Sequence, residues 1–337
     1  MFFAELGAKV IKVENKLTGG DVTRQWKLPS ESKSEKISAY FASVNYGKKS
    51  IFLDFNNKQD KQKLYKLIEY ADIVISNYKK GDAEKWGMDY SVLKKIKPDI
   101  IYAHISGYGT HSDRVAYDVV LQAESGFMAM NGNKISGPMK MPVAIIDLMA
   151  AHQMKEAILV AMINRLKTGK GAFVTVSLYD SAIASLANQG SNWLMEKYIP
   201  ERMGSLHPNI APYGEIVKTK DNKEIVLAVG NNDQYKNLCI ALGDLSLVND
   251  KKFSNNVDRL KHRKILKSKL DKLFSKKNAS QWMKIFADKN IPAGVCTTID
   301  KVLREDKAAK MTLSYKNVTT KKILRSLKTV VFEITSA

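Results

Sequence analysis

Short apolar runs alternate with helical patterns in the first third of the chain, and this alternation restricts the possible folds most. Helical patterns cover 57–70 and 89–97. Runs rich in β-branched residues, each suited to a buried strand, lie at 7–14, 51–54, 72–76 and 100–105. Strands that alternate with helices predict a parallel, Rossmann-like sheet with helices on both faces, that is, an α/β fold. Because ligands of such sheets bind at the carboxyl ends of the strands, Asn77 and Tyr78 fall on the expected functional edge.

The second half of the chain shows a different pattern. A strand is expected at 172–178 and a helix at 179–195, and the proline-containing stretch 199–212 suggests a linker. One strand at 224–230 is then followed by lysine-rich helices. We therefore predict a large α/β domain at 1–198, a linker at 199–212, a smaller α/β domain at 213–300, and a return segment toward the large domain at 301–337.

Composition excludes several classes of protein. No apolar run of the 337 residues approaches the length of a membrane span, and the first residues are charged too early for a secretory signal. Two cysteines and five scattered histidines give no metal-ligand spacing, so we expect reduced thiols, no metal site and a cytoplasmic enzyme. The net charge of +20 comes from scattered lysines without a nucleic-acid-binding motif, and we predict neither a nucleic-acid nor a membrane partner.

Asp147 occupies a special place in the sequence. Residues 143–146 predict a short buried strand, and the residues from there to Gly169 predict an amphipathic helix with a glycine stop. Asp147 would then face free backbone N–H groups and the positive end of the helix dipole, which favours its ionised form. Such a carboxylate can act as a nucleophile, or it can simply be the N-cap of its helix. The segment alone leaves both interpretations open.

Five separated blocks, in order, resemble class III CoA-transferases, the CaiB/BaiF family. They are ELGAKVIKVEN with GGDVTRQW, the segment 71–109, AYDVVLQAESGFMAMNG, HPNIAPYG and IPAGVCTTIDKVL. The blocks GNNDQY and FSNNVDRLKHRKIL are most similar to the branch that moves CoA between dicarboxylates such as succinate and glutarate-type or hydroxymethylglutarate-type acids. The resemblance implies the CaiB/BaiF CoA-transferase fold, with acyl-CoA and a free carboxylic acid as substrates and with no permanently bound cofactor.

The resemblance also implies a mechanism. In VAIIDLMAA, Asp147 matches the family's catalytic aspartate, which forms a mixed anhydride and then an aspartyl-CoA thioester. Tyr117 falls where the related acyl-CoA racemases have a histidine, and tyrosine, with a pKa of about 10, is a poor base at neutral pH. Tyr117 therefore favours a transferase, with an α-methylacyl-CoA racemase-like enzyme as the alternative.

Six positions match the family's CoA contacts. Tyr78 would pack beside the adenine, Lys80 and Lys85 would neutralise phosphates, and Leu53 would touch the nucleotide. The remaining two are Asn77 and Asn15, the latter in a slot where the family commonly has a basic or adenine-contacting residue.

Two further expectations follow from the family pattern. Members form interlocked homodimers, so a homodimer is expected here. Members also begin with an earlier strand and a glycine-proline loop and continue further at the carboxyl end, so both termini are expected to be truncated. An inactive, truncated CoA-transferase homologue is therefore a third interpretation.

Overall fold

The computed structural model describes residues 1–316 and 323–335. It forms two compact units. Unit 1 comprises Met1–Arg114, Ala151–Ser177 and Ile299–Ala337, and unit 2 comprises Val115–Ala150 and Leu178–Thr298. The boundaries of these units differ from the domain boundaries expected after 198, 212 and 300. The expected domain division stays a prediction.

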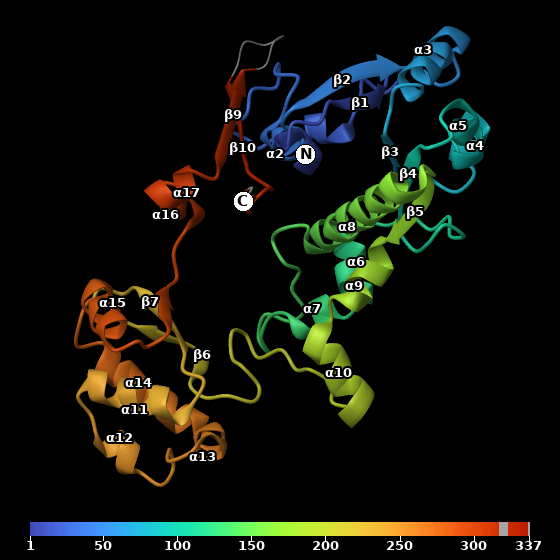
Figure 1. Ribbon diagram of the computed structural model, residues 1–337. Helices are drawn as coiled ribbons and strands as arrows, with labels where there is room; N and C mark the ends of the chain where they lie inside the picture. Colours follow the sequence, from blue (N-terminus) through green and yellow to red (C-terminus); the bar gives the residue numbers. More distant parts are fainter. Residues whose placement is uncertain (317–322, 336–337) are drawn as a thin grey trace. The chain divides into compact units, whose positions relative to one another are not determined.

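The five strands predicted between residues 7 and 178, apart from the one at 143–146, are present in unit 1, and they are parallel (Figure 1). They are β1 (Val10–Asn15), β2 (Lys48–Leu53), β3 (Ile73–Ser76), β4 (Ile101–Ser106) and β5 (Ala172–Ser177). The predicted α/β class with parallel strands is confirmed. The strands form two sheets, β1-β2 and β3-β4-β5, so β1 and β3 each pair on one side only in the described part of the chain.

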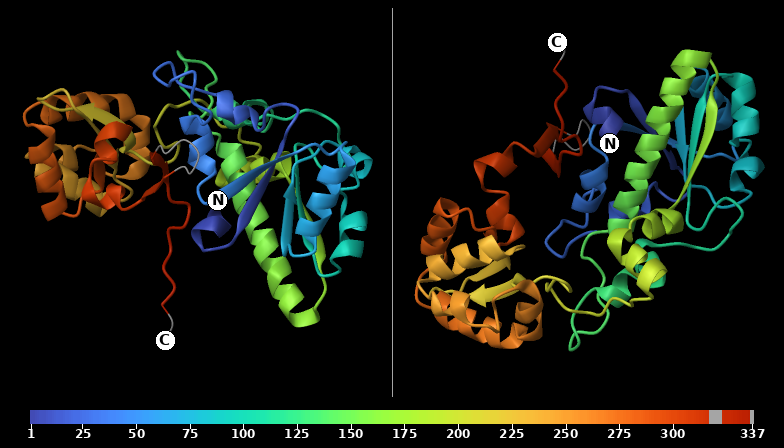
Figure 2. Two further views of the ribbon diagram at one scale, coloured as in Figure 1. Left: turned by 90° about the horizontal axis from the view of Figure 1, so that it is seen from above. Right: turned by 60° about the horizontal axis from the view of Figure 1, so that its bottom comes forward.

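Helices cover both faces of the sheet β3-β4-β5, as Figure 2 shows. The long helix α8 (Ile145–Thr168) places Met154 and Ile158 against Ala103 of β4. Tyr102, which points to the opposite face of β4, packs in the cluster built by α3 (Lys58–Ile68) and α5 (Tyr90–Ile96). This two-sided burial follows from the alternation of side chains along a strand.

The remaining elements of unit 1 lie at its start and end. They are α1 (Phe2–Glu5), the 3-10 helix η1 (Val22–Gln25), α2 (Ala39–Val44), α4 (Asp82–Trp86), α16 (Ile299–Val302), α17 (Asp306–Ala309), β9 (Thr312–Lys316) and β10 (Ile323–Leu327). Strands β9 and β10 pair antiparallel, and Leu324 and Tyr315 pack on Phe41 of α2. The last strand therefore shares a small core with a helix near the start of the chain.

Unit 2 begins with α6 (Asp118–Glu124) and α7 (Phe127–Met130) and continues with α9 (Leu178–Ala184) and α10 (Ala187–Glu196). The single helix predicted at 179–195 is two helices, because Ala187 takes a positive φ of 50° and interrupts it. The strand predicted at 143–146 is wrong. Its last residues begin α8 instead, since the backbone N–H of Ile146 finds an acceptor in Asp118.

The carboxyl-terminal part of unit 2 is a small antiparallel sheet with five helices. The strands, in the order β6-β7-β8, are β6 (Tyr213–Lys218), β7 (Glu224–Ala228) and β8 (Ala293–Val295). The helices are α11 (Asn232–Leu242), α12 (Ser246–Asn249), α13 (Asn256–Lys261), α14 (Arg263–Phe274) and α15 (Ala279–Asp288).

Sequence patterns revealed only one of these three strands. In strand β6 a buried acid, Glu215, interrupts the apolar alternation that would predict a strand. Glu215 forms an ion pair with Arg263 at 2.6 Å. Strand β8 has only three residues, too few for a period to be recognised.

Candidate active site

The amino-terminal ends of two helices meet in unit 2 through one carboxylate. Asp118 is the first residue of α6, directly after Tyr117. Its Oδ1 accepts hydrogen bonds from the backbone N–H groups of Ile146, at 2.8 Å, and Asp147, at 3.4 Å. Asp118 therefore satisfies the free donors at the start of α8, where a negative charge also stabilises the helix dipole.

A chain of polar contacts continues from Asp118 along the segment that leads to Asp147. Oδ2 of Asp118 accepts from Nε2 of Gln122 at 2.6 Å, and Oε1 of the fully buried Gln122 accepts from the backbone N–H of Met141 at 2.8 Å. Further back, Asn131 and Met139 exchange two hydrogen bonds. These contacts fix the approach to α8 on the helices that precede it.

Asp147 is the third residue of α8 and is exposed. Its pKa is raised to about 6, chiefly because surrounding protein displaces water from the carboxyl and secondly because the charge of Asp118 lies close by. The expectation that the helix end would favour the ionised form is therefore wrong. Since the first N–H groups of α8 bond to Asp118, the N-cap interpretation of Asp147 is also wrong.

The altered pKa still leaves Asp147 suited to nucleophilic chemistry. A carboxyl group with a pKa of about 6 is mostly ionised at pH 7, and it is more basic than an ordinary aspartate. A more basic carboxylate is a stronger nucleophile, and exposure gives an incoming carbonyl access to it. The arrangement can therefore support acyl transfer to the carboxylate.

Tyr117 lies next to the residue that caps α8, and 62% of its surface is exposed. Its backbone is extended, with φ of −132°, so α6 begins only after it. The hydrogen bonds of Asp118 bring the starts of α6 and α8 together, and Tyr117 and Asp147 both lie at these starts. The catalytic role of Tyr117 stays a prediction.

The six predicted CoA contacts all lie in unit 1. Leu53 and Tyr78 belong to the same apolar cluster, in which Tyr78 packs edge-on against Trp86 at 5.4 Å between ring centroids. Burial raises the pKa of Tyr78 to about 12, so this ring is an apolar surface rather than an acid. Leu53 is only 7% exposed and offers little surface to a nucleotide.

The polar members of this group are exposed. Asn15 lies beside Leu53 in the register of β1 and β2, and its side chain accepts from the backbone N–H of Leu17 at 2.9 Å. Asn77 and Lys80 follow the end of β3, and Lys85 precedes Trp86 in α4. The structure thus brings Asn15, Leu53 and Tyr78 to the carboxyl ends of their strands.

Asp118 is the functional residue that the sequence interpretation missed. It stands in the same AYD triplet as Tyr117, so the signal was an acid directly before an apolar helical pattern. The backbone N–H of Ile146, from which Asp118 accepts a hydrogen bond, lies 28 residues further along the chain, so no local pattern pairs the two. The described residues contain no group of three or more His, Cys, Asp and Glu side chains that could hold a metal ion, and no described helix could cross a bilayer.

Comparison with known proteins identifies the family. The model of CoA-transferase family III matches residues 1–332. The chain is 35% identical to a succinate–glutarate CoA-transferase of Agrobacterium fabrum over 308 residues, which cover 90% of this chain and 76% of that protein. It is 34% identical to the succinyl-CoA:glutarate CoA-transferase of Homo sapiens, over 90% of this chain and 69% of the relative.

A solved structure agrees with these sequence matches. A CaiB/BaiF family protein from Brucella suis superposes with a TM-score of 0.85 at 33% identity, and the match covers 98% of this chain and 87% of that one. The resemblance noted in the sequence and the expected fold are both confirmed.

Proposed function

This chain belongs to CoA-transferase family III, and we propose that it moves CoA between an acyl-CoA and a free dicarboxylate through the carboxylate of Asp147. The observation that carries the role of Asp147 is its position: an exposed carboxylate in the first turn of α8, with its pKa raised to about 6 and with Asp118 fixing the turn that carries it. Membership in the family makes the chain a CoA-transferase, and the steps below are our proposal.

The first half of the reaction transfers the donor acyl group. A carboxylate oxygen of Asp147 attacks the thioester carbonyl, and the C–S bond breaks. CoA leaves as a thiolate, and the acyl group stays on Asp147 as a mixed anhydride. The thiolate then attacks the aspartyl carbonyl of the anhydride. The donor acid leaves as a carboxylate, and an aspartyl-CoA thioester remains.

The second half runs the same steps in reverse order with the acceptor. The acceptor carboxylate attacks the aspartyl thioester, CoA thiolate leaves, and a new anhydride forms between the acceptor and Asp147. Attack of the thiolate on the acceptor carbonyl yields acceptor-CoA and restores the Asp147 carboxylate. No proton is taken up or released overall, so the chemistry needs a nucleophile rather than a general base.

Substitution of the nucleophile tests this proposal. Asp147→Asn keeps the size of the side chain and removes the nucleophile, so CoA exchange is expected to be lost while CoA binding in calorimetry stays near the wild-type affinity. Glu156→Gln, on an exposed position of the same helix, is the matched control and should keep full activity. Exchange at the wild-type rate in Asp147→Asn would refute the role of Asp147.

The dicarboxylate preference rests on the relatives, which are named for succinate and glutarate. We expect CoA exchange between succinyl-CoA and glutarate to be faster than exchange between acetyl-CoA and a monocarboxylate with as many carbon atoms as glutarate. The racemase alternative predicts deuterium wash-in at the α-carbon of an acyl-CoA without any acceptor acid. Wash-in by wild type but not by Asp147→Asn would favour that alternative.

We also propose a cytoplasmic homodimer. The two cysteines form no disulfide, in keeping with a reducing compartment. Helix α10 and the residues after it expose several large apolar side chains, including Leu194, Met195 and Ile199. An apolar surface of this kind is typical of a protein–protein interface.

A further inference from the structure

The carboxyl end of the sheet β3-β4-β5 in unit 1 carries a histidine that the proposed reaction does not use. His104 lies on β4, and its register partners are Ser76 of β3 and Thr175 of β5, the two neighbouring strands (Figure 1). Register partners share a face of the sheet, so three polar side chains lie together on one face. Because ligands of parallel sheets bind at this edge, these side chains are candidates for contact with a substrate.

Ser76 fixes the orientation of the imidazole ring. Oγ of Ser76 lies 3.0 Å from Nδ1 of His104, and Ser76 is only 6% exposed. Within the described part of the chain, Nε2 of His104 has no hydrogen-bond partner. The side chain of His104 is half-buried. A ring held through Nδ1 by a buried hydroxyl leaves its opposite nitrogen for a ligand.

His104 lies beside the predicted CoA contacts that follow β3. Ser76, its hydrogen-bond partner, directly precedes Asn77 and Tyr78. Tyr102 stands two residues before His104 on the same face of β4, and it packs in the same apolar cluster as Tyr78. The imidazole therefore lies at the end of the cluster on which the adenine of CoA is predicted to pack.

Two opposing effects set the charge of the imidazole. Burial lowers the pKa of His104 below its ordinary value, and the charge of Glu84 on α4 acts in the opposite direction. Tyr102, the titratable neighbour on β4, is neutral at pH 7 because burial raises its pKa. Lys85, a predicted phosphate contact, follows Glu84 on α4. His104 is therefore mostly neutral at pH 7, and a bound anion would favour its protonated form.

From this orientation and position we propose that His104 is a further CoA-binding residue, whose Nε2–H donates a hydrogen bond to a phosphate oxygen of acyl-CoA. The inference rests on the proposed function, because it needs CoA at the predicted contacts. Donation from the Ser76 hydroxyl to Nδ1 places the single proton of the neutral ring on Nε2. Protonation of the ring keeps this donor and adds a charge, so the charged form binds phosphate more tightly.

Nuclear magnetic resonance of the histidine rings tests the contact. The chain has five histidines, so labelling their Cε1 atoms with ¹³C gives few signals, and His104→Gln assigns the signal of interest. We expect coenzyme A to shift the His104 signal saturably and to raise the midpoint of its pH titration. His152, exposed on α8, should keep its midpoint, and pantetheine, which has no phosphate, should leave that of His104 unchanged. An unchanged midpoint with coenzyme A, or an equal rise with pantetheine, would overturn the inference.

Calorimetry with coenzyme A compares the variants. His104→Ala is expected to weaken binding about tenfold, because a hydrogen bond to a charged group is lost. His104→Gln keeps an N–H donor but cannot gain a proton, so the ratio of wild-type to His104→Gln affinity should grow as the pH falls from about 8 to about 6. A purely structural role of His104 would not give this pH dependence.

Two further results separate this inference from the proposed function. His152→Gln is the matched control and should bind coenzyme A as the wild type does. Equal binding by wild type and His104→Ala at both pH values would overturn the role of His104 and leave the proposed function intact. A wild-type protein that binds no coenzyme A would contradict the proposed function as well.

Discussion

Asp118 and Asp147 show how two neighbouring carboxylates take different roles. Asp118 accepts three hydrogen bonds, from Ile146, Asp147 and Gln122, whereas Asp147 is left with a raised pKa near the charge of Asp118. Between pH of about 4 and about 6 the folded chain binds more protons at Asp147 than the unfolded chain does. The contribution of Asp147 to stability therefore falls as the pH rises through this range.

The same shift predicts the pH dependence of catalysis. Because the ionised carboxylate is the nucleophile, the rate of acyl transfer should rise with pH, with a midpoint near the Asp147 pKa of about 6. Asp118→Asn removes the neighbouring charge, so the midpoint should move to lower pH. Single-turnover rates between pH 4.5 and 8 measure it.

A control separates charge from position. Gln122→Ala also disturbs the segment before α8, through the lost hydrogen bonds to Met141 and to Asp118, but it removes no charge. It should lower the rate without moving the midpoint. A midpoint that stays unchanged in Asp118→Asn would contradict the electrostatic account.

Gly20 is the second residue whose identity is fixed by its surroundings. Its φ is 104°, and an added Cβ would lie 2.5 Å from Oε2 of Glu14 and 2.8 Å from the ring of Phe52. We expect Gly20→Ala to destabilise the fold by about 2–4 kcal/mol, through backbone strain and overpacking. Gly19→Ala, at a φ of 75° with open space around it, should cost about 1–2 kcal/mol. Chemical denaturation compares the two, and equal losses would contradict the steric explanation.

At the scale of elements, helix α8 derives its stability in unit 1 from one buried stripe. Met154, Ile158 and Ala161 are buried, and Val160 on another face is 66% exposed. The stripe has the spacing of an amphipathic helix and packs on β4 and β5. Burial, rather than local propensity, therefore holds this helix on the sheet.

A pair of truncations tests this view of α8. Ile158→Ala removes a fully buried side chain, and we expect a loss of about 2–5 kcal/mol in the free energy of unfolding. Val160→Ala should change it by only about 0.5 kcal/mol, because that side chain faces solvent. Urea denaturation of both variants measures the difference. A large effect at Val160 would reveal that the exposed face is covered in solution.

At the scale of the whole molecule, exposed apolar surface is the main feature left without a partner within one described chain. Leu194 is 72% exposed and Met195 is 77% exposed on α10. Such neighbouring side chains on one short helix cost free energy in water unless another surface covers them. A second copy of the chain is the partner that we propose.

Charge insertion tests the proposed homodimer. We expect wild type to elute with the mass of two chains, and Leu194→Glu with Met195→Glu to elute with the mass of one while keeping its far-ultraviolet spectrum. Size-exclusion chromatography with light scattering measures both. Leu245→Glu, at an exposed apolar position outside α10, is the control and should stay dimeric. A wild-type protein with the mass of one chain would refute the homodimer.

The sequence determined what depends on neighbouring residues along the chain. The apolar runs that became β1 to β5 and the glycine after α8 were readable because strand periodicity and helix stops are local properties. The proposed role of Asp147 and the six predicted CoA contacts rest on motifs, which are also local, and they stay predictions. Strands β6 and β8 were not predicted, because one contains a charged residue and the other is short. Their pairing with β7, rather than a sequence pattern, makes them strands.

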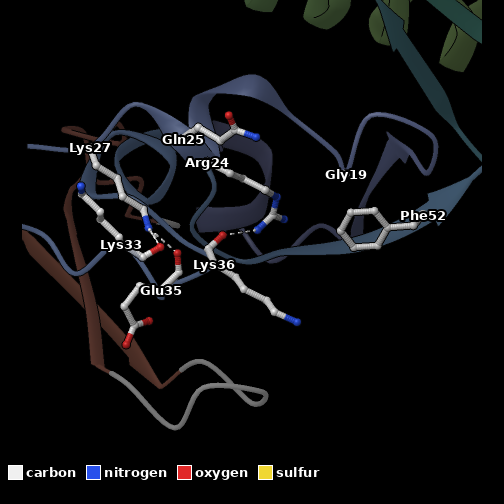
Figure 3. A pocket seen from close by; sticks show the side chains of 8 residues that line it. All are labelled: Gly19, Arg24, Gln25, Lys27, Lys33, Glu35, Lys36 and Phe52. Carbon is white, nitrogen blue, oxygen red and sulfur yellow. Dashed lines mark hydrogen bonds between the residues drawn. The ribbon is translucent and has the colours of Figure 1, made fainter.

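Tertiary structure alone decided which distant groups meet. The raised pKa of Asp147 follows first from the protein that surrounds its carboxyl and then from Asp118, whose carboxylate bonds to the start of α8. The loop that follows Arg24 likewise takes its shape because Arg24 reaches back to Glu14 on β1 and because Lys27 donates to backbone carbonyls of the loop, as Figure 3 shows for Lys27. Hydrogen-bond partners and desolvation depend on which segments fold together, and no local pattern encodes that choice.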